Sequence, residues 1–309
     1  MVWRLFMVGF VACAVDKPAA DTSAAGTGDS CPIDTLGVGE VQVLATGFDV
    51  DGTEGTEGLA FSPDGRLFVG GSGVKGDGYV AEIQADGTWS LVADVPGSVG
   101  LAWQGDRLLV AVSDVGDGTG GLVAVDPDSG VVEVRASGIA GSNFPAVTPW
   151  GTVLVSSPSG GTLWEVRDGT VSAWAEGVPS PNGIAFSPDG TTVYVANTYA
   201  TPSTVASIPV AGESAGAVGV LATLPDGSTQ DGVAMDAAGN LYVVNNLPGT
   251  IARITPDGTV TTVAEGVAFG ASLAFGEGAW DPCSLYVSSL FSPDVFRVGV
   301  GAPGALPFR

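Results

Sequence analysis

The sequence predicts an all-β protein built from six copies of one unit, and three observations support this prediction. Glycine is in excess, with 48 among 309 residues and no collagen-like period, which is typical of many short strands joined by tight turns. No long helical pattern competes with that reading. One hairpin pattern, consisting of two β-rich runs around a turn, recurs six times along the chain.

The six hairpins share an apolar pattern around turns such as Ser62-Pro63-Asp64-Gly65. They are EGLAFSPDGRLFVG, VGLAWQGDRLLVAV, NFPAVTPWGTVLVS, NGIAFSPDGTTVYVA, DGVAMDAAGNLYVV and ASLAFGEGAWDPCSLYVS. Their second residues lie 42, 44, 39, 49 and 40 residues apart, and a second pair of strands around another turn follows most of them. Four short strands repeated at a period of about 40 residues predict a β-propeller with six four-stranded antiparallel blades.

The two ends of the repeat region predict how the ring closes. After Pro293, the segment DVFRVGV supplies only a third strand for the last blade. The segment EVQVLATGF from Glu40 resembles the fourth strands TVTTVAEGV and TVSAWAEGV. We therefore expect this N-terminal strand to complete the last blade, which hides edges that would otherwise pair with other chains.

The first residues indicate export. Arg4 precedes an apolar run over residues 5–12 that is too short to span a bilayer and is typical of a secretory signal. FVAC resembles the bacterial lipobox, in which Cys13 would become the lipidated first residue, although Phe10 stands where leucine is usual. We expect a lipoprotein-like signal peptide over 1–12, a flexible tether over 13–38, the propeller over 39–300 and a C-terminal tail over 301–309. The expected location is the bacterial cell envelope, lipid-anchored in the periplasm or facing the surface, or otherwise secreted.

The other two cysteines agree with export. Cys31 stands just before the propeller and Cys283 near its end, and an exported chain allows them to pair. Such a disulfide would clamp the blade that the N-terminal strand completes. The alternative is two unpaired buried thiols.

The charge and the residue types limit the possible partners and chemistry. With 33 acidic and 10 basic residues, the net charge of −23 repels nucleic acid and anionic lipid, so cations are the expected small partners and a lipid anchor the only expected membrane contact. Most of the carboxylates need only keep an exported protein soluble, and we expect a monomer. The chain has no histidine, which excludes a Ser-His-Asp triad, a Cys-His pair and His-ligated zinc or iron.

One repeat position carries an unusual set of side chains. In a propeller the first strand of each blade lines the central channel, so the residue before it lies near the channel mouth in every blade. These residues are Glu57, Val99, Asn143, Asn182, Asp231 and Ala271. Two carboxylates and two amides suit a hard cation, and Ca²⁺ better than Mg²⁺. The alternative is that each is an ordinary polar loop residue.

The second strand of each blade returns to the same mouth and brings further polar residues. They are Ser113, Asp114, Asn197, Thr198, Asn245 and Asn246. We expect Asp114, Asn197 and Asn246 in particular to orient metal ligands or touch a substrate, with ordinary loop roles as the alternative.

Three segments resemble the regucalcin, gluconolactonase and luciferin-regenerating enzyme family of six-bladed propellers: SPNGIAFSPDGTTVYVAN, QDGVAMDAAGNLYVV, and ASLAFGEG with LYVSS. The resemblance covers about Glu40 to Val300. It implies a divalent metal ion held by Glu57, Asn182 and Asp231, with Asn143 contacting the metal or the substrate.

The chain departs from the sugar-lactonase pattern around Asn143. That pattern usually has an arginine shortly before the asparagine and Asp-Gly after it, whereas Gly141 and Ser142 precede Asn143 here and Phe144 and Pro145 follow. An aldonolactone substrate is therefore not expected. The aromatic residues Trp103, Phe144 and Trp150 could form a more apolar pocket, or could each pack in the core.

Three hypotheses follow for function. The first is a calcium-dependent hydrolase of a small lactone, ester or phosphoester, in which Ca²⁺ or another divalent cation acts as a Lewis acid in the channel and Asp231 as general base or nucleophile. The second is a non-catalytic cell-surface propeller that binds a glycan or protein and holds a structural calcium ion. The third is that the four donors bind only water.

Overall fold

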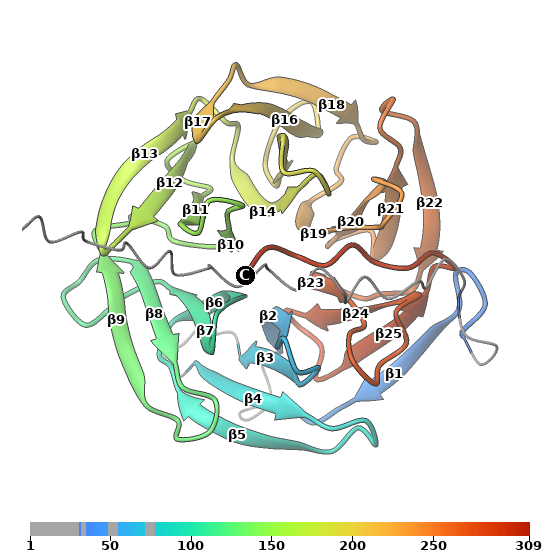
Figure 1. The fold of residues 1–309 in the computed structure, drawn as a ribbon. Helices are drawn as coiled ribbons and strands as arrows, with labels where there is room; N and C mark the ends of the chain where they lie inside the picture. Colours follow the sequence, from blue (N-terminus) through green and yellow to red (C-terminus); the bar gives the residue numbers. More distant parts are fainter. Residues whose placement is uncertain (1–30, 32–34, 49–54, 72–77) are drawn as a thin grey trace, which may run out of the picture.

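The computed structural model describes residues 31, 35–48, 55–71 and 78–309. In these residues the chain forms six antiparallel β-sheets arranged in a ring around a central channel, which confirms the predicted six-bladed propeller (Figure 1). The expected signal peptide, Cys13 and most of the expected tether lie outside the described residues. Within them, no helix has the length and apolar character needed to cross a membrane.

The first three blades follow one another in sequence, and each has four strands. Blade one consists of β2 (Thr56–Phe61), β3 (Leu67–Gly71), β4 (Tyr79–Ile83) and β5 (Trp89–Asp94). Blade two consists of β6 (Ser98–Gln104), β7 (Arg107–Val112), β8 (Gly121–Val125) and β9 (Val132–Ser137). Blade three consists of β10 (Pro145–Val147), β11 (Val153–Ser157), β12 (Thr162–Arg167) and β13 (Thr170–Glu176).

The last three blades include one elaboration and the closure of the ring. Blade four consists of β14 (Pro181–Phe186), β15 (Thr192–Asn197), β16 (Thr204–Ala211), β17 (Ser214–Ala215) and β18 (Gly219–Thr223), with both β17 and β18 paired to β16. Blade five consists of β19 (Gln230–Met235), β20 (Leu241–Asn245), β21 (Thr250–Ile254) and β22 (Val260–Glu265). Blade six consists of β23 (Gly270–Phe275), β24 (Ser284–Ser289), β25 (Val295–Gly299) and β1 (Val41–Ala45).

Blade six is closed by the N-terminal strand, as the sequence predicts. Strand β1 pairs antiparallel with β25, with Val41 opposite Val298. The structure also joins Cys31 to Cys283 in a disulfide with a Cα–Cα distance of 5.6 Å. The first and last described parts of the propeller are therefore held together both by main-chain hydrogen bonds and by a covalent bond.

The hairpin turns are made by the residues that the sequence pattern singles out. In blade four, Ser187 N donates to Thr192 O at 2.8 Å, and Gly190 N donates to Ser187 O at 2.8 Å. Gly190 has a φ of 70°, which a residue without a side chain adopts without steric cost. These turns lie at the far end of the channel, opposite the mouth where the first strands begin.

The core is divided among the blade interfaces. Six clusters of buried apolar residues each combine side chains from two neighbouring blades, and together they complete the ring. For example, Leu59 and Ile83 of blade one pack with Tyr286 and Val295 of blade six. Each blade is therefore held by the hydrophobic contacts that it makes with both neighbours.

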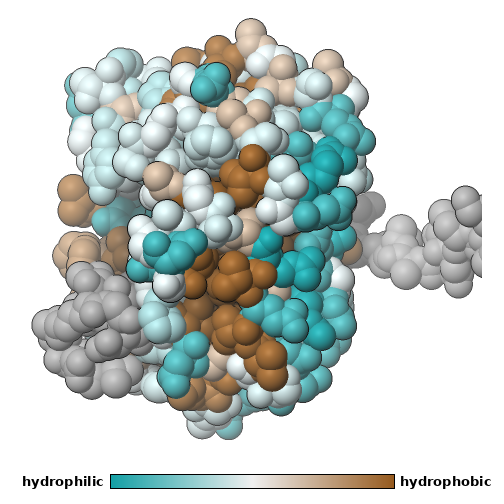
Figure 2. Space-filling view, turned by 90° about the vertical axis from the view of Figure 1, so that its left-hand side faces the viewer, coloured by the Kyte–Doolittle hydropathy of each residue, from teal (hydrophilic) through white to brown (hydrophobic). Residues whose placement is uncertain are grey.

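The outer rim is a mixed surface. Figure 2 shows the edge that contains the outer strands of blades two and three, where apolar side chains gather between polar ones. Strand β9 contributes Val132 and Val134, which are exposed. Each blade thus has two unpaired edges. The edge of the fourth strand lies on this outer rim, and the edge of the first strand lies in the channel, where the six first strands face one another.

Candidate metal centre at the channel mouth

A β-bulge aims the predicted ligands into the channel mouth. In blades one, two, four, five and six the pairing of the first strand with the second shifts by one residue near the start of the first strand. Glu57, Asn182 and Asp231 each lie inside such a shift, between Thr56 and Leu59, Pro181 and Ile184, and Gln230 and Val233 respectively. A bulge leaves its extra residue outside the ladder and redirects its side chain.

Close approaches between the blades place the mouth residues in one ring. A Cβ on Gly183 would lie 2.4 Å from Asp231 O, and a Cβ on Gly58 would lie 2.4 Å from Val99 O. A side chain at either position would collide with the main chain of the next blade, so glycine is needed for this spacing. The ring closes because Ser288 Oγ donates a hydrogen bond to Glu57 O and accepts one of 2.9 Å from Ser272 N.

Asp231 is the centre of the cluster. Its carboxylate is 7% exposed, and Oδ2 accepts a hydrogen bond of 3.4 Å from Asn246 Nδ2. Asn246 is fixed in turn, because the same Nδ2 also donates to Gly270 O at 3.2 Å. The structure thus brings together Asp231 from the first strand of blade five and Asn246, which follows the second strand of that blade.

Burial disfavours the charged forms of both carboxylates. Burial raises the pKa of Glu57 to about 7. The pKa of Asp231 is raised well above its usual range, first by burial and then by the charge of Glu57, against hydrogen bonds from Asn182 and Asn246. Among the described residues, no arginine forms an ion pair with either carboxylate. Ionisation of both carboxylates would therefore place negative charge at the mouth that no described cationic side chain balances.

Asn182 contributes an oxygen with free acceptor capacity. Its side chain is buried, and its Oδ1 has no hydrogen-bond partner among the described residues. A buried amide oxygen without a partner costs free energy, and a bound cation would remove that cost. Two uncompensated carboxylates and one unpartnered amide oxygen form a donor set that fits a hard divalent cation. Within the described residues no three acidic, cysteine or histidine side chains come together, so amides must supply part of any such site.

Asn143 and Asp114 are placed differently from Glu57, Asn182, Asp231 and Asn246. Asn143 is half-buried next to blade two, where Gly100 N donates to its main-chain oxygen at 2.9 Å. In the described part of the chain, no hydrogen bond joins its side chain to Glu57, Asn182 or Asp231. Asp114 is exposed, and its Oδ1 accepts hydrogen bonds from Gly116 N and Gly118 N, which stabilise its own loop.

Further buried amides lie behind the mouth. Asn197 donates to Thr204 Oγ1 at 3.1 Å, whereas its Oδ1 has no partner among the described residues. Gln230, which the sequence analysis did not select, is fully buried with neither side-chain amide atom partnered in the same residues. Thr198 Oγ1 donates to the main-chain oxygen of Gln230 at 2.6 Å. The only sequence signal for Gln230 was its place directly before Asp231.

Apolar side chains surround the mouth on blades four, five and six. The exposed residues on the loops at this end are Tyr199, Leu247, Phe269 and Phe291. Phe269 and Phe291 contact each other edge to face, with ring centroids 5.5 Å apart. Leu290 N donates to Phe269 O, and Gly55 N donates to Leu290 O, which links this pair to the segment just before Glu57. We call these four residues the apolar rim.

The aromatic residues considered for a substrate pocket lie elsewhere. Trp103 and Phe144 line an apolar cavity toward the far end of the channel. Trp150 is packed against Phe186 and donates its indole N–H to Glu165 Oε1 at 2.9 Å. These three aromatic residues therefore belong to the far end of the channel or to the core. The sequence analysis did not predict the apolar rim, because its four residues lie in loops outside the repeat pattern.

Several solved structures share this fold. A gluconolactonase from Xanthomonas campestris is similar at 17% identity, with a TM-score of 0.69 over 89% of this chain and 97% of that one. The calcium-binding protein regucalcin from Agrobacterium tumefaciens is similar at 21% identity, with a TM-score of 0.69 over 86% and 96%. A luciferin-regenerating enzyme is similar at 17% identity, with a TM-score of 0.69 over 87% and 98%. At these identities the similarity shows the fold.

Sequence comparison gives the family. No curated protein sequence matches the chain significantly. The family model described as SMP-30/Gluconolactonase/LRE-like region matches residues 82–291, which is more than half of the chain and includes Asn143, Asn182 and Asp231. The chain therefore belongs to the SMP-30/gluconolactonase/LRE-like family of six-bladed β-propellers.

Proposed function

We propose that the protein is a metal-dependent hydrolase that opens a lactone or ester at the channel mouth. Ca²⁺ is the cation that the donor set favours, and Glu57, Asn182 and Asp231 would hold it. The observation that carries the proposal is a pair of carboxylates without a described cationic partner, buried Asp231 and half-buried Glu57, beside the unpartnered oxygen of Asn182. Membership of a family that includes gluconolactonases supports a lactonase-type reaction.

When bound, the cation would act as a Lewis acid that polarises the substrate carbonyl and favours ionisation of a neighbouring water. The residues of the chain do the rest. Asp231 accepts the proton from the attacking water and returns it to the leaving oxygen, so the products are a carboxylic acid and an alcohol. Asn246 and Asn182 hydrogen-bond the Asp231 carboxylate and hold its orientation. Burial raises the pKa of the Asp231 carboxyl in the absence of a cation, and a bound cation would favour its ionised form, which is the form that accepts a proton.

We expect the mouth to favour a small substrate in which the polar group that reacts is attached to an apolar group. The apolar rim offers Tyr199 and Phe291, which are 77% and 59% exposed, as contacts for that apolar group. Gly141 and Ser142 precede Asn143, so no arginine is available there to bind a sugar hydroxyl or carboxylate. A lactone or ester with an alkyl or aryl substituent is therefore preferred over an aldonolactone, and a phosphoester is the second substrate class to test.

The first experiment is a calcium titration by calorimetry on the full chain, freed of metal with a chelator, in parallel with Asp231→Ala and Asp114→Ala. We expect one-to-one binding in the parent and in Asp114→Ala, because Asp114 only stabilises its own loop. Asp231→Ala should lose binding. A screen of lactones, esters and phosphotriesters, with and without chelator, then tests for hydrolysis.

Two results would contradict the proposal in different ways. If folded protein binds no divalent cation, the metal centre is wrong. If it binds the cation and hydrolyses none of the substrates, the hydrolase is wrong while the metal centre stands.

The apolar rim also supports a second candidate, a non-catalytic cell-surface propeller that binds a glycan or a protein. Phe269, Phe291, Leu247 and Tyr199 form an exposed surface of the kind that binding partners cover. A structural calcium ion would then stiffen the mouth beneath it. Cation binding without turnover, combined with retention of the protein on a glycan or protein array, is the expected result for this candidate.

We also propose that the protein works outside the cytoplasm, anchored to the bacterial cell envelope through lipid on Cys13. The disulfide between Cys31 and Cys283 supports export, because such bonds persist in oxidising compartments. Mass spectrometry of the mature N-terminus, compared with a Cys13→Ser variant, tests the lipid. An unmodified N-terminus that retains residues 1–12 would contradict this proposal.

A further inference from the structure

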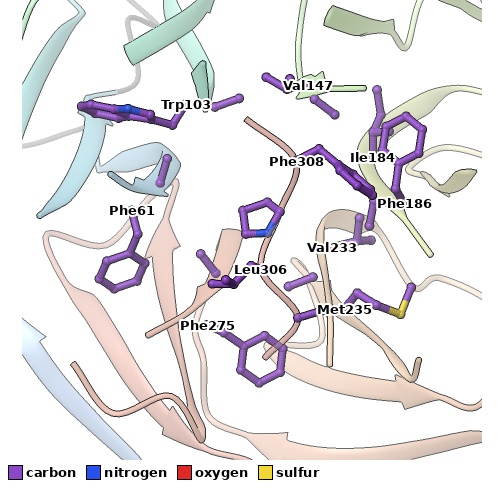
Figure 3. Close-up of a pocket in the computed structure, with 18 of the residues that line it drawn as sticks. Phe61, Trp103, Val147, Ile184, Phe186, Val233, Met235, Phe275, Leu306 and Phe308 are labelled. Carbon is purple, nitrogen blue, oxygen red and sulfur yellow. The ribbon is translucent and has the colours of Figure 1, made fainter. Parts of the chain in front are cut away.

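The far end of the central channel contains an apolar chamber of about 150 Å³. The first strands of all six blades form its wall, and residues 305–308 of the C-terminal tail cross it as a strap (Figure 3). Neither Glu57, Asn182 nor Asp231 lines the chamber. It is therefore distinct from the candidate metal centre at the mouth.

Small side chains at one repeat position form the space. Three residues after the mouth position, every blade carries an alanine, and all six alanines line the chamber: Ala60, Ala102, Ala146, Ala185, Ala234 and Ala274. The residue after each alanine is phenylalanine or tryptophan in four of the six blades. A ring of methyl groups thus surrounds the channel axis, bordered by aromatic side chains.

The side chains that line the chamber offer little polarity. Those of Trp103, Ser187 and Glu277 carry polar atoms, and each has a partner outside the chamber wall. Trp103 Nε1 donates to Gly105 O at 2.8 Å, and Ser187 Oγ donates to Asp189 Oδ1 at 2.6 Å. Glu277 forms an ion pair with Arg309. A charged ligand would therefore leave water without finding a free counter-ion among these residues.

The main chain supplies the remaining polar groups. Each first strand pairs with a second strand on one side only, so its other edge faces the channel. Phe61 O accepts a hydrogen bond from Arg309 Nη2 at 3.4 Å, and Met235 O accepts one from Ala305 N at 2.9 Å. Both bonds are made from the lumen side by residues of the tail, so we expect a ligand with one hydrogen-bond donor to reach a main-chain oxygen along the same edges.

The strap is attached at both of its ends. At the start, Gly304 N donates to Pro282 O at 3.1 Å, and Ala305 N bonds Met235 O. At the end, Arg309 pairs with Glu277, and the Phe308 ring contacts Phe186 edge to face at 5.7 Å. Between these attachments, Leu306 is 72% exposed. The strap therefore crosses the chamber as a single segment of chain that belongs to none of the six blades.

We propose that this chamber is a second binding site, for an uncharged, single-ring aromatic molecule that carries one hydrogen-bond donor, and that the strap gates it. A partly open apolar cavity of about 150 Å³ is large enough to hold a benzene-sized ring. The alanine ring sets the size limit, the low polarity excludes charge, and the main-chain edges receive the donor. This inference does not depend on the proposed hydrolase activity.

The test is a titration of the full chain with phenol, followed by ligand-observed NMR and by calorimetry, with benzoate as a charged molecule of similar size. We expect saturable one-to-one binding of phenol and at least a tenfold weaker response to benzoate. Ala234→Leu and Ala146→Leu, from different blades, should each weaken phenol binding at least tenfold because leucine fills the chamber. Ala173→Leu, on the exposed face of β13, is the matched control and should bind like the parent.

The strap has its own measurement. Arg309→Ala removes the ion pair with Glu277, so phenol should dissociate at least threefold faster while the fold is retained by circular dichroism. Absence of saturable phenol binding to the folded parent would overturn the site, as would binding that both leucine variants leave unchanged. Phenol exchange that is unaltered in Arg309→Ala would overturn the gate.

Discussion

The two ends of the central channel are built by the same six strands, yet they differ in chemistry. At the mouth, buried Asp231 and half-buried Glu57 lack a described cationic partner, and their pKa values are raised. At the far end, Glu277 is also buried and its pKa is raised, but Arg309 opposes that shift through an ion pair. The comparison teaches that the repeated backbone provides equivalent positions in every blade, and that the side chains at those positions decide the chemistry. The residue at the mouth position suits a cation, whereas the alanine three residues later suits an apolar ring at the far end.

The largest expected effect is that of Asp231→Asn on turnover. Loss of the proton acceptor should lower kcat for a lactone or ester by about 10²–10⁴-fold, the range typical of general acid–base catalysis. Steady-state kinetics at saturating Ca²⁺ measure it, with circular dichroism to establish the fold. Asp114→Asn is the matched control, and turnover by Asp231→Asn close to that of the control would remove Asp231 from the mechanism.

A substitution at the blade interface should next affect stability. In Gly183→Ala, the new methyl group meets Asp231 O at 2.4 Å and must push blades four and five apart. Such overpacking costs about 1–3 kcal/mol, and the free energy of unfolding from urea titrations should fall by that amount. Cation binding should weaken with it. Gly37→Ala, where the methyl would lie 3.6 Å from Glu40 Oε2, should change neither quantity.

The pH dependence distinguishes the mouth from an ordinary acidic surface. Without divalent cation, the folded pKa of Glu57 is about 7 and its unfolded value is 4.5, so between these values the folded protein binds more protons than the unfolded one. The free energy of unfolding should therefore decrease as pH rises from 4.5 to 7. Denaturant titrations in chelator measure this slope, and excess Ca²⁺ should reduce or reverse it.

Glu57→Gln is the variant that assigns this slope. It should flatten the pH dependence, because glutamine does not titrate, whereas Glu40→Gln on the surface should leave it unchanged. A parent protein whose stability rises over this interval would show that the mouth carboxylates are charged and compensated without metal.

The smallest effect should come from the apolar rim. Phe291→Ser removes an aromatic side chain that contacts Phe269, so KM for a lactone with an alkyl substituent should rise about threefold to tenfold, the range for a lost apolar contact. The kcat should change little, because the aromatic contact of Phe291 is with Phe269 on the apolar rim and not with the proposed proton acceptor. Val134→Ser, on outer strand β9, is the control. Equal kinetics for an unsubstituted lactone and a substituted one in the parent would contradict a role for the rim.

The repeat explains how much of this structure the sequence could predict. The hairpin turns, the six blades and the closure by β1 follow from glycine, proline and apolar periodicity, which are local signals repeated six times. The repeat position selected Glu57, Asn143, Asn182 and Asp231 as donors at the mouth, and the resemblance to the family implied the set of Glu57, Asn182 and Asp231. The bulges that aim them were not predicted, since a one-residue shift depends on packing against the next blade.

Other features lie outside the repeat and therefore escaped prediction. The apolar rim is in loops of differing length, and the strap consists of residues expected to form only a tail. Asn143 lies at the same repeat position as the predicted ligands Glu57, Asn182 and Asp231. In the described residues, however, no hydrogen bond links its side chain to any of these three. Phe144 occupies the place that glycine holds in four other blades, and it lines the chamber.

The closure of blade six has a consequence for proteolysis. The disulfide between Cys31 and Cys283 joins positions 252 residues apart, so the chain between them is a covalent loop that contains five complete blades and two strands, β1 and β23, of the sixth. A protease that cuts this loop once opens the backbone without releasing a fragment, and the two pieces would migrate together on a gel until a reductant separates them. If the protein is exported as proposed, such a nick would leave every blade in contact with both neighbours.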